Sequence, residues 1–244
     1  MDHSHPSLPP FRRALLKLSG EALLGKRPYG IDPGAAERCA RDIAGVQASG
    51  LQICVVVGGG NIFRGMAASA SGMERVRADF IGMMATVMNG VALESAFIAL
   101  GKPVSLHSAI PVQQVAPPFE RDRALRELEA GRVVIFVGGT GNPFFTTDTT
   151  AALRAAEMNC DVILKATQVD GIYSADPKRD PAATRYDRLT YDDALRRNLQ
   201  VMDGSAFAIA RDTGIPILVF CGDGDGSIQA ALAGTARSTL VTAG

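Results

Sequence analysis

Residues 132–157 read RVVIFVGGTGNPFFTTDTTAALRAAE and predict a strand, a loop and a helix in that order. The opening RVVIFV is almost entirely apolar, which is typical of a strand buried on both faces. The alanine-rich end predicts a helix that begins near Thr147. In between, three glycines loosen the backbone and Pro143 interrupts any helix. A helix N-cap accounts for one of the polar residues, whereas a loop that wraps a small polar ligand accounts for all of residues 140–147.

Strand-like and helix-like runs alternate along the rest of the chain. We expect strands at residues 13–19, 51–57, 102–107, 132–137, 161–165 and 215–220. We expect helices at residues 32–50, 75–100, 120–130, 191–198 and 205–213, and from residue 147. Strands without polar alternation are buried between helix layers. The sequence therefore predicts a single three-layer α/β/α domain with a mostly parallel central sheet over residues 11–244. Residues 1–10, with His3, His5 and several prolines, predict a disordered tail rather than a metal site.

Composition limits the class of protein. The 244 residues carry no formal net charge, so neither nucleic acid nor an acidic membrane is indicated as the main partner. The longest apolar stretch, residues 80–100, contains Asn89, Gly90 and Glu94 and predicts a buried helix rather than a membrane span. The N-terminus lacks the apolar core of a signal peptide. The four cysteines have no CxxC spacing, which indicates free thiols and a cytoplasmic location.

Two lysines end predicted strands. Lys17 lies in KLSGEAL (residues 17–23), and Lys165 lies in DVILKATQVDGIYSADP (residues 161–177). Ligands of parallel sheets gather outside the carboxyl ends of the strands. Fixed ammonium groups there suit phosphoryl transfer, which needs positive charge along the line of transfer. The alternative for Lys17 is a solvated strand-end side chain, and for residues 168–177 a simple turn.

A glycine run follows the second predicted strand. VVVGGGNIFRG (residues 55–65) leaves backbone N–H groups free for a phosphate, and Arg64 could return over the same site. The run matches neither the P-loop nor the dinucleotide-binding glycine pattern, which excludes a P-loop kinase. A structural tight turn is the alternative.

Two carboxylates are candidates to orient the lysines. Asp161 begins a strand and Asp203 lies in VMDGSAFAIARD (residues 201–212). Either could equally cap a helix or face solvent, and their spacing does not decide between these roles. Residues 221–227 (CGDGDGS) lack the ligand register and closing glutamate of a calcium loop and predict a turn.

Several motifs occur in the order and spacing of one known family. They are LLKLSGEAL, GGGNIFRG, RADFIGMMATVMNG, GTGNPFFTTDTTA, DVILKATQVDGIYSADP and VMDGSAFAIARD. From about Arg13 to its end, the chain resembles the bacterial uridylate kinases of the amino acid kinase superfamily. The resemblance implies an amino acid kinase-like fold and ATP-dependent phosphorylation of UMP to UDP, with magnesium, in pyrimidine nucleotide synthesis.

The resemblance also implies roles for individual residues. Beside the candidates for phosphoryl transfer found above, Lys17, Lys165 and Arg64 with Asp161 or Asp203, it assigns contacts with each nucleotide. ATP would contact Lys17, Leu18, Ser19, Gly20, Gly60, Arg64, Thr167, Tyr173 and Asp176. UMP would contact Gly59, Asp79, Thr140, Gly141, Asn142, Pro143, Phe144, Phe145, Thr146 and Thr147.

Regulation and assembly are implied in the same way. The family is typically a homohexamer that GTP activates and UTP inhibits. The GTP-responsive segment would be Gly25, Lys26, Arg27, Pro28, Tyr29 and Gly30, a loop whose sequence is individual to this chain. Phe80 and Gln168 also depart from the family pattern, which often has histidine and lysine or asparagine there.

Two other functions remain as alternatives. A non-catalytic ATP-binding storage or sensor protein of the same fold, such as a molybdate-storage protein, would be expected to lose the loop at residues 140–147. A carbamate or amino acid kinase would need groups for a different acceptor in place of that loop.

Overall fold

The computed structural model describes residues 11–64, 72–197, 199 and 202–243. The predicted disordered tail, residues 1–10, lies outside the described residues.

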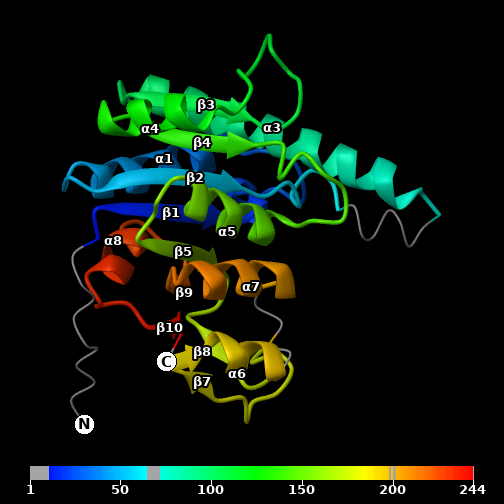
Figure 1. The fold of residues 1–244 in the computed structure, drawn as a ribbon, viewed down its shortest axis with the longest axis vertical. Coiled ribbons are helices and arrows are strands. Elements are labelled where there is room, and N and C mark those ends of the chain that lie inside the picture. Colours follow the sequence, from blue (N-terminus) through cyan, green and yellow to red (C-terminus); the bar gives the residue numbers. More distant parts are fainter. Residues whose placement is uncertain (1–10, 65–71, 198, 200–201, 244) are drawn as a thin grey trace.

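An eight-stranded sheet runs through the described part of the chain, in the order β3-β4-β2-β1-β5-β9-β10-β8 (Figure 1). Its strands are β1 (Arg13–Leu18), β2 (Gln52–Val57), β3 (Val104–Ser108), β4 (Val133–Val137), β5 (Val162–Thr167), β8 (Arg188–Thr190), β9 (Ile217–Cys221) and β10 (Ser238–Thr242). The strands from β3 to β9 pair in parallel, whereas β10 runs antiparallel to β9. The predicted mostly parallel sheet is confirmed.

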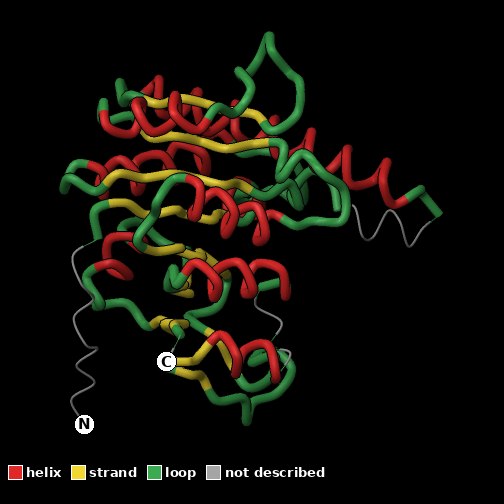
Figure 2. The backbone as a smooth tube through the Cα atoms, in the orientation of Figure 1, coloured by secondary structure: helices red, strands yellow, loops and turns green. Residues whose placement is uncertain are grey.

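Helices cover both faces of the sheet, as the backbone in Figure 2 shows. One face packs against α1 (Pro33–Gln47), α3 (Arg75–Ala99) and α8 (Ser227–Leu232). The other packs against α4 (Arg121–Glu129), α5 (Thr147–Glu157), α6 (Tyr191–Arg196) and α7 (Gly204–Thr213). Successive side chains of a strand point to opposite faces of the sheet. Leu16 of β1 therefore packs on the side of α1, α3 and α8, and Leu15 packs on the side of α4, α5, α6 and α7. The three layers agree with the prediction.

The structure also contains short elements that were not predicted, most of them in the carboxyl-terminal half. A two-stranded ribbon of β6 (Ile172–Tyr173) and β7 (Arg185–Tyr186) begins in the segment that suggested a turn. A short 3-10 helix, η1 (Gly20–Leu23), follows β1. β8, β10 and α8 were also absent from the prediction, since runs this short give no clear hydrophobic period. Residues 222–226 do form the predicted turn, with Gly224 and Gly226 at positive φ.

α3 is the only described helix long and apolar enough to cross a membrane. It lies against the sheet, with Leu93 and Phe97 fully buried in the core. Gly90 allows α3 to approach β4 closely, because a Cβ at this position would lie 2.2 Å from Cγ1 of Val137 on β4. α3 is therefore a core helix, as its interrupted apolar sequence predicted. Among the described residues all four cysteines are free.

Candidate active site

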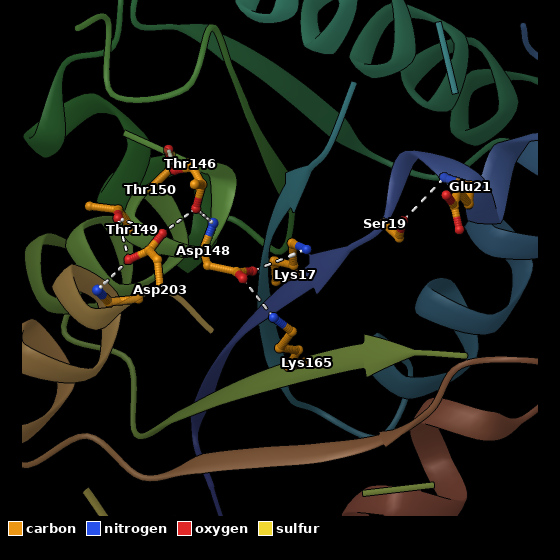
Figure 3. Close-up of polar contacts among 10 residues, drawn as sticks. Lys17, Ser19, Glu21, Thr146, Asp148, Thr149, Thr150, Lys165 and Asp203 are labelled. Atoms are coloured by element: carbon orange, nitrogen blue, oxygen red, sulfur yellow. Dashed lines mark hydrogen bonds and ion pairs between the residues drawn. The ribbon is translucent and has the colours of Figure 1, made fainter. Parts of the chain in front are cut away.

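Two lysines face each other across adjacent strands. Lys17 on β1 is in direct register with Lys165 on β5, near the carboxyl end of each strand. Their neighbours Leu16 and Leu164 point into the core on the α1 and α3 side. Alternation along the strand therefore turns both lysines toward α5, where Figure 3 shows them converging.

Asp148 lies between the two lysines (Figure 3). Its Oδ1 is 3.0 Å from Lys17 Nζ, and its Oδ2 is 2.6 Å from Lys165 Nζ. Asp148 belongs to the first turn of α5, which Thr146 caps by accepting a hydrogen bond from the Asp148 amide. This cap aims the carboxylate at the strand ends. Asp148 was not among the predicted site residues.

Burial and charge oppose each other in this cluster. Burial alone would raise the pKa of the Asp148 carboxyl, but the charges of Lys17 and Lys165 outweigh it, so the pKa is lower than usual. Burial lowers the pKa of Lys165 to about 8, although the nearby charge of Asp148 acts in the opposite direction. Lys165 thus has a strongly perturbed pKa, and perturbed pKa values cluster at functional sites.

Asp203 supports the cluster from α7. Its Oδ1 caps that helix by accepting the Ala206 amide at 2.8 Å, and Thr149 donates to the same oxygen at 2.8 Å. Thr146 also donates a hydrogen bond to Asp203. The carboxylate therefore fixes the start of α5 to the start of α7, and its charge helps to keep Lys165 protonated. Of the three roles that the sequence left open, orienting a lysine, capping a helix or facing solvent, Asp203 caps a helix.

The interpretation of Asp161 as a carboxylate beside the lysines is wrong. Its Oδ2 accepts hydrogen bonds from the amides of Arg12 and Arg13, at 2.7 Å and 2.8 Å, where β1 begins. Lys17 is near the other end of that strand. Asp161 thus ties the amino ends of β1 and β5 together. The available signal pointed to Asp148 instead, since a helix that starts at the carboxyl edge aims its first turn at strand-end residues.

A cavity of about 220 Å³ opens beside this cluster, between α3 and the glycine-rich loops. It is lined by Gly59, Gly60, Phe63, Arg75, Ala78, Asp79, Gly82, Met83, Thr86, Gly139, Phe145, Thr146 and Thr147. We call it the acceptor cavity. The set includes Gly59, Asp79 and residues 145–147 of the predicted UMP contacts. Residues 140–144 are not among its lining, and Phe144 is 64% exposed.

α3 holds the loop between β4 and α5 at two points. The Gly138 amide donates to Thr86 Oγ1 at 2.8 Å, and the Phe144 amide donates to Asp79 Oδ2 at 2.8 Å. Gly138 and Gly141 have positive φ, and so does Phe144, at 73°. The glycines adopt this conformation without strain, whereas a non-glycine residue such as Phe144 adopts it only when contacts compensate.

The loops after β1 and β2 approach each other closely. A Cβ on Gly20 would lie 2.3 Å from Asn61 Oδ1 and 2.8 Å from the Gly58 carbonyl oxygen, so this crossing requires glycine. The Gly58 amide continues the pairing by donating to Leu18 O at 2.9 Å. The predicted phosphate-binding residues of the two loops are thus neighbours.

The other predicted ATP contacts are spread more widely. Leu18, Ser19 and Thr167 line a second cavity of about 70 Å³, together with Glu21 and Gln168. Arg64 forms an ion pair with Glu21 rather than with Asp148. Gln168 Nε2 donates to the other oxygen of Glu21 at 2.7 Å, so Glu21 links three loops, a role that the sequence did not indicate.

Tyr173 and Asp176 lie away from these cavities. The Tyr173 hydroxyl donates to Asp170 Oδ1 at 2.5 Å, and Asp176 accepts the Lys178 amide at 2.9 Å. Neither residue lines the cavities described above. Both side chains stabilise the turns around β6 in this structure.

Comparison with known proteins agrees with this geometry. The model of the amino acid kinase family matches residues 12–221. The chain belongs to the amino acid kinase family. This family member is 40% identical to a UMP kinase from Bacillus anthracis, with a TM-score of 0.91 over 96% of this chain and 97% of that one. A UMP kinase from Ureaplasma parvum is 38% identical, with a TM-score of 0.90 over 95% and 98% of the two chains.

A more distant structure shares the same architecture. A uridylate kinase from Archaeoglobus fulgidus is 31% identical to this amino acid kinase family member, with a TM-score of 0.71 over 94% and 99% of the two chains. These similarities show that this member of the amino acid kinase family is a kinase.

Proposed function

We propose that the protein transfers the terminal phosphoryl group of ATP to UMP, forming UDP and ADP. The observation that carries the proposal is the arrangement of Lys17, Asp148 and Lys165 beside the acceptor cavity. A transferring phosphoryl group gathers negative charge on its oxygens, and preorganised cations stabilise that charge better than water does. The similarity to UMP kinases supports UMP as the acceptor.

The residues divide between the two substrates. Lys17, Ser19, Gly20 and Gly60 would meet the phosphates of ATP, with Thr167, Tyr173 and Asp176 toward its nucleoside. For the last two, side chains would leave their present turn contacts. Gly59, Asp79 and residues 140–147 would hold UMP, and Phe145 and Thr146 already line the cavity.

Magnesium would enter with ATP. No group of three or more His, Cys, Asp or Glu side chains suited to a metal occurs among the described residues. Proteins commonly bind Mg²⁺ through substrate phosphates and one or two carboxylates, and this is the coordination that we propose here. Asp203, next to the cluster, would share in that coordination by giving up one of its hydrogen bonds from Thr146, Thr149 or Ala206.

The exposed side of α3 supports assembly into a homohexamer. Ile81, Met84, Met88, Val91 and Ile98 are large, exposed and spaced three, four or seven residues apart, so they form one apolar stripe. A stripe of this kind marks an interaction surface. Light scattering after size-exclusion chromatography should give six copies for the wild type. Met88→Glu should lower that number, whereas Arg77→Glu on the same helix should not.

Regulation by GTP and UTP is proposed through the loop at residues 25–30. Gly25 and Lys26 line a cavity of about 350 Å³ whose charged lining is mixed, with Lys26 and Arg38 as cations beside the carboxylates of Glu21, Asp42, Asp223 and Asp225. Gly30 exchanges two hydrogen bonds with Asn61, which follows the glycine run. Initial rates with and without each effector test this; Lys26→Ala should weaken the response to GTP. A location in the cytoplasm and a place in pyrimidine nucleotide synthesis belong to the same proposal.

The decisive experiment is an ADP-release assay with ATP and magnesium, offering UMP, CMP, dUMP, AMP, aspartate and carbamate in parallel. Phosphorylation of UMP with little turnover of aspartate and carbamate would support the proposal. Tight ATP binding without turnover of UMP would favour a storage or sensor protein. Turnover of carbamate or aspartate would favour another kinase of the family.

A further inference from the structure

Arg75, the first residue of α3, binds the carboxylate of Asp79 one helical turn later. The Arg75 Nε–H lies 2.9 Å from Oδ1 and 2.8 Å from Oδ2 of Asp79, so one donor is shared between both oxygens. Asp79 Oδ2 also accepts the Phe144 amide at 2.8 Å. The guanidinium carbon of Arg75 lies 5.5 Å from the centre of the Phe144 ring. Arg75 therefore contacts both the carboxylate and the loop segment that this carboxylate holds.

The contact differs from an ordinary pair on a helix surface. The Asp79 side chain is only 12% exposed and the Arg75 side chain 36%, and both line the acceptor cavity. The neighbouring pair on the same helix, Arg77 and Glu74, is 80% and 69% exposed with its atoms 3.7 Å apart. Exposed pairs of that kind contribute little, whereas a shielded charge-assisted hydrogen bond fixes geometry. Arg77 thus provides a matched control for Arg75.

The Asp79 carboxylate can accept few further hydrogen bonds. A carboxylate offers about four lone-pair sites. Arg75 occupies one site on each oxygen and the Phe144 amide occupies another on Oδ2. One site therefore remains, on Oδ1. A single sugar hydroxyl can bind there without any change in the loop. A vicinal diol that engages both oxygens must displace the Phe144 amide from Oδ2.

We propose that Arg75 is a positioning residue that makes Asp79 selective for a ribose diol over a 2′-deoxyribose. It fixes the orientation of the Asp79 carboxylate at the edge of the acceptor cavity through the Nε–H that both oxygens share. This inference rests on the proposed function, since it assigns the sugar of the acceptor nucleotide to the α3 side of the cavity. Arg75 acts through Asp79 and contacts no reacting atom.

The test compares Arg75→Met with Arg77→Met, using UMP and dUMP as acceptors at saturating ATP. For Arg75→Met, KM for UMP should rise roughly tenfold, the equivalent of one charge-assisted hydrogen bond. The value of kcat should stay within about twofold, because the phosphoryl site is untouched. KM for dUMP should change less, so the preference for UMP over dUMP should fall. Arg77→Met should leave every value unchanged.

A double-mutant cycle separates positioning from general damage. In an Asp79→Ala background, Arg75→Met should add no further change in KM for UMP, because its effect passes through the missing carboxylate. Arg75→Lys, whose ammonium can still reach Asp79, should restore most of the UMP affinity. Thermal unfolding and ATP binding check that each variant is folded.

Three results would overturn the inference: equal effects of Arg75→Met and Arg77→Met, equal loss for UMP and dUMP, or a full Arg75→Met penalty in the Asp79→Ala background. These results differ from failure of the proposed function, in which the wild-type protein itself would form no UDP. Wild-type activity toward UMP is therefore measured first.

Discussion

The Nζ atom of Lys165 lies 2.6 Å from Oδ2 of Asp148, inside a side-chain environment that is largely closed to water. The contact with Asp148 favours the protonated form of Lys165. Burial disfavours that form and is the larger effect, so the pKa of Lys165 is lowered to about 8. The charge needed for phosphoryl transfer is therefore present at neutral pH and sensitive to alkaline pH.

We expect kcat/KM for the wild-type protein to fall as pH rises through about 8, because Lys165 loses its proton there. Asp148→Asn should move this fall to lower pH, since the carboxylate charge raises the pKa of Lys165. Rates between pH 6 and 10 with a pH-independent coupling system provide the measurement. A falling limb that stays in place in Asp148→Asn would contradict the assignment.

The same pKa predicts how stability depends on pH. Lys165 is protonated in both the folded and unfolded states below pH 8, so the cost of burying its charge is fully present there. Between about pH 8 and the usual lysine pKa of 10.5, the unfolded state keeps the proton that the folded state has lost, so this group makes the free energy of unfolding increase with pH. Urea titrations at two pH values within this range, compared with Lys165→Met, isolate the contribution, which should vanish in the variant.

Asp148→Asn should lower kcat by about a hundredfold or more at neutral pH, the scale seen when one preorganised electrostatic group is lost. The amide cannot hold both lysines, and their mutual repulsion should spread them apart. KM for UMP should change little, because Asp148 does not line the acceptor cavity. Asp161→Asn serves as the comparison: it should lower the melting temperature and leave kcat nearly unchanged.

Lys17→Ala should reduce kcat far more than it weakens binding of ATP. Its ammonium stabilises charge that develops during transfer, so its contribution belongs to the transition state. Steady-state kinetics and a separate binding titration with a non-hydrolysable ATP analogue distinguish the two effects. A rise in KM for ATP alone would assign Lys17 to ground-state binding.

Asp79→Asn should chiefly raise KM for UMP. The amide presents one acceptor oxygen in place of two and loses the charge that pairs with Arg75. Kinetics at varied UMP and fixed saturating ATP measure the effect. If only the dependence on ATP changed, Asp79 would not belong to the acceptor site.

Gly90→Ala should destabilise the fold by about 1–3 kcal/mol, the usual cost of overpacking a core. The added methyl would meet Cγ1 of Val137 at 2.2 Å and Cδ1 of Leu106 at 3.0 Å, pushing α3 away from β4 and β3. Urea denaturation measures the loss. Gly82→Ala on the same helix meets no atom within 4 Å and should be neutral or stabilising.

The sequence predicts the parallel core well, for a physical reason. Strands such as β2 and β4 are buried on both faces and are therefore almost entirely apolar, which makes them recognisable in the sequence. β10 at the margin carries three polar residues among five, and β6 and β7 have two residues each, so no period can emerge. Those strands depend on pairing partners that are distant in sequence.

The candidate site was predictable where motif and strand end coincide, and less so where partners are remote. Lys17 and Lys165 follow from their positions at strand ends. Asp161 precedes β5 and so lies at the end of that strand away from Lys165, whereas the contact of Asp148 with both lysines depends on the packing of α5 over β1 and β5. Similarly, the link between Glu21 and Gln168 joins residues 147 positions apart.

Lys17 and Lys165 lie in register on adjacent strands, in a different part of the fold from the loops that line the acceptor cavity. The separation of their backbones is set by the hydrogen-bonding distance between adjacent strands, about 4.8 Å, which no loop can alter. The acceptor cavity, in contrast, is built from loops and from one end of α3. Replacement of residues 138–145, which keeps the Thr146 cap of α5, should therefore change the acceptor while the cationic pair stays in place. The scaffold is modular: its inner strands carry the reaction, and its connecting segments determine which molecule undergoes it.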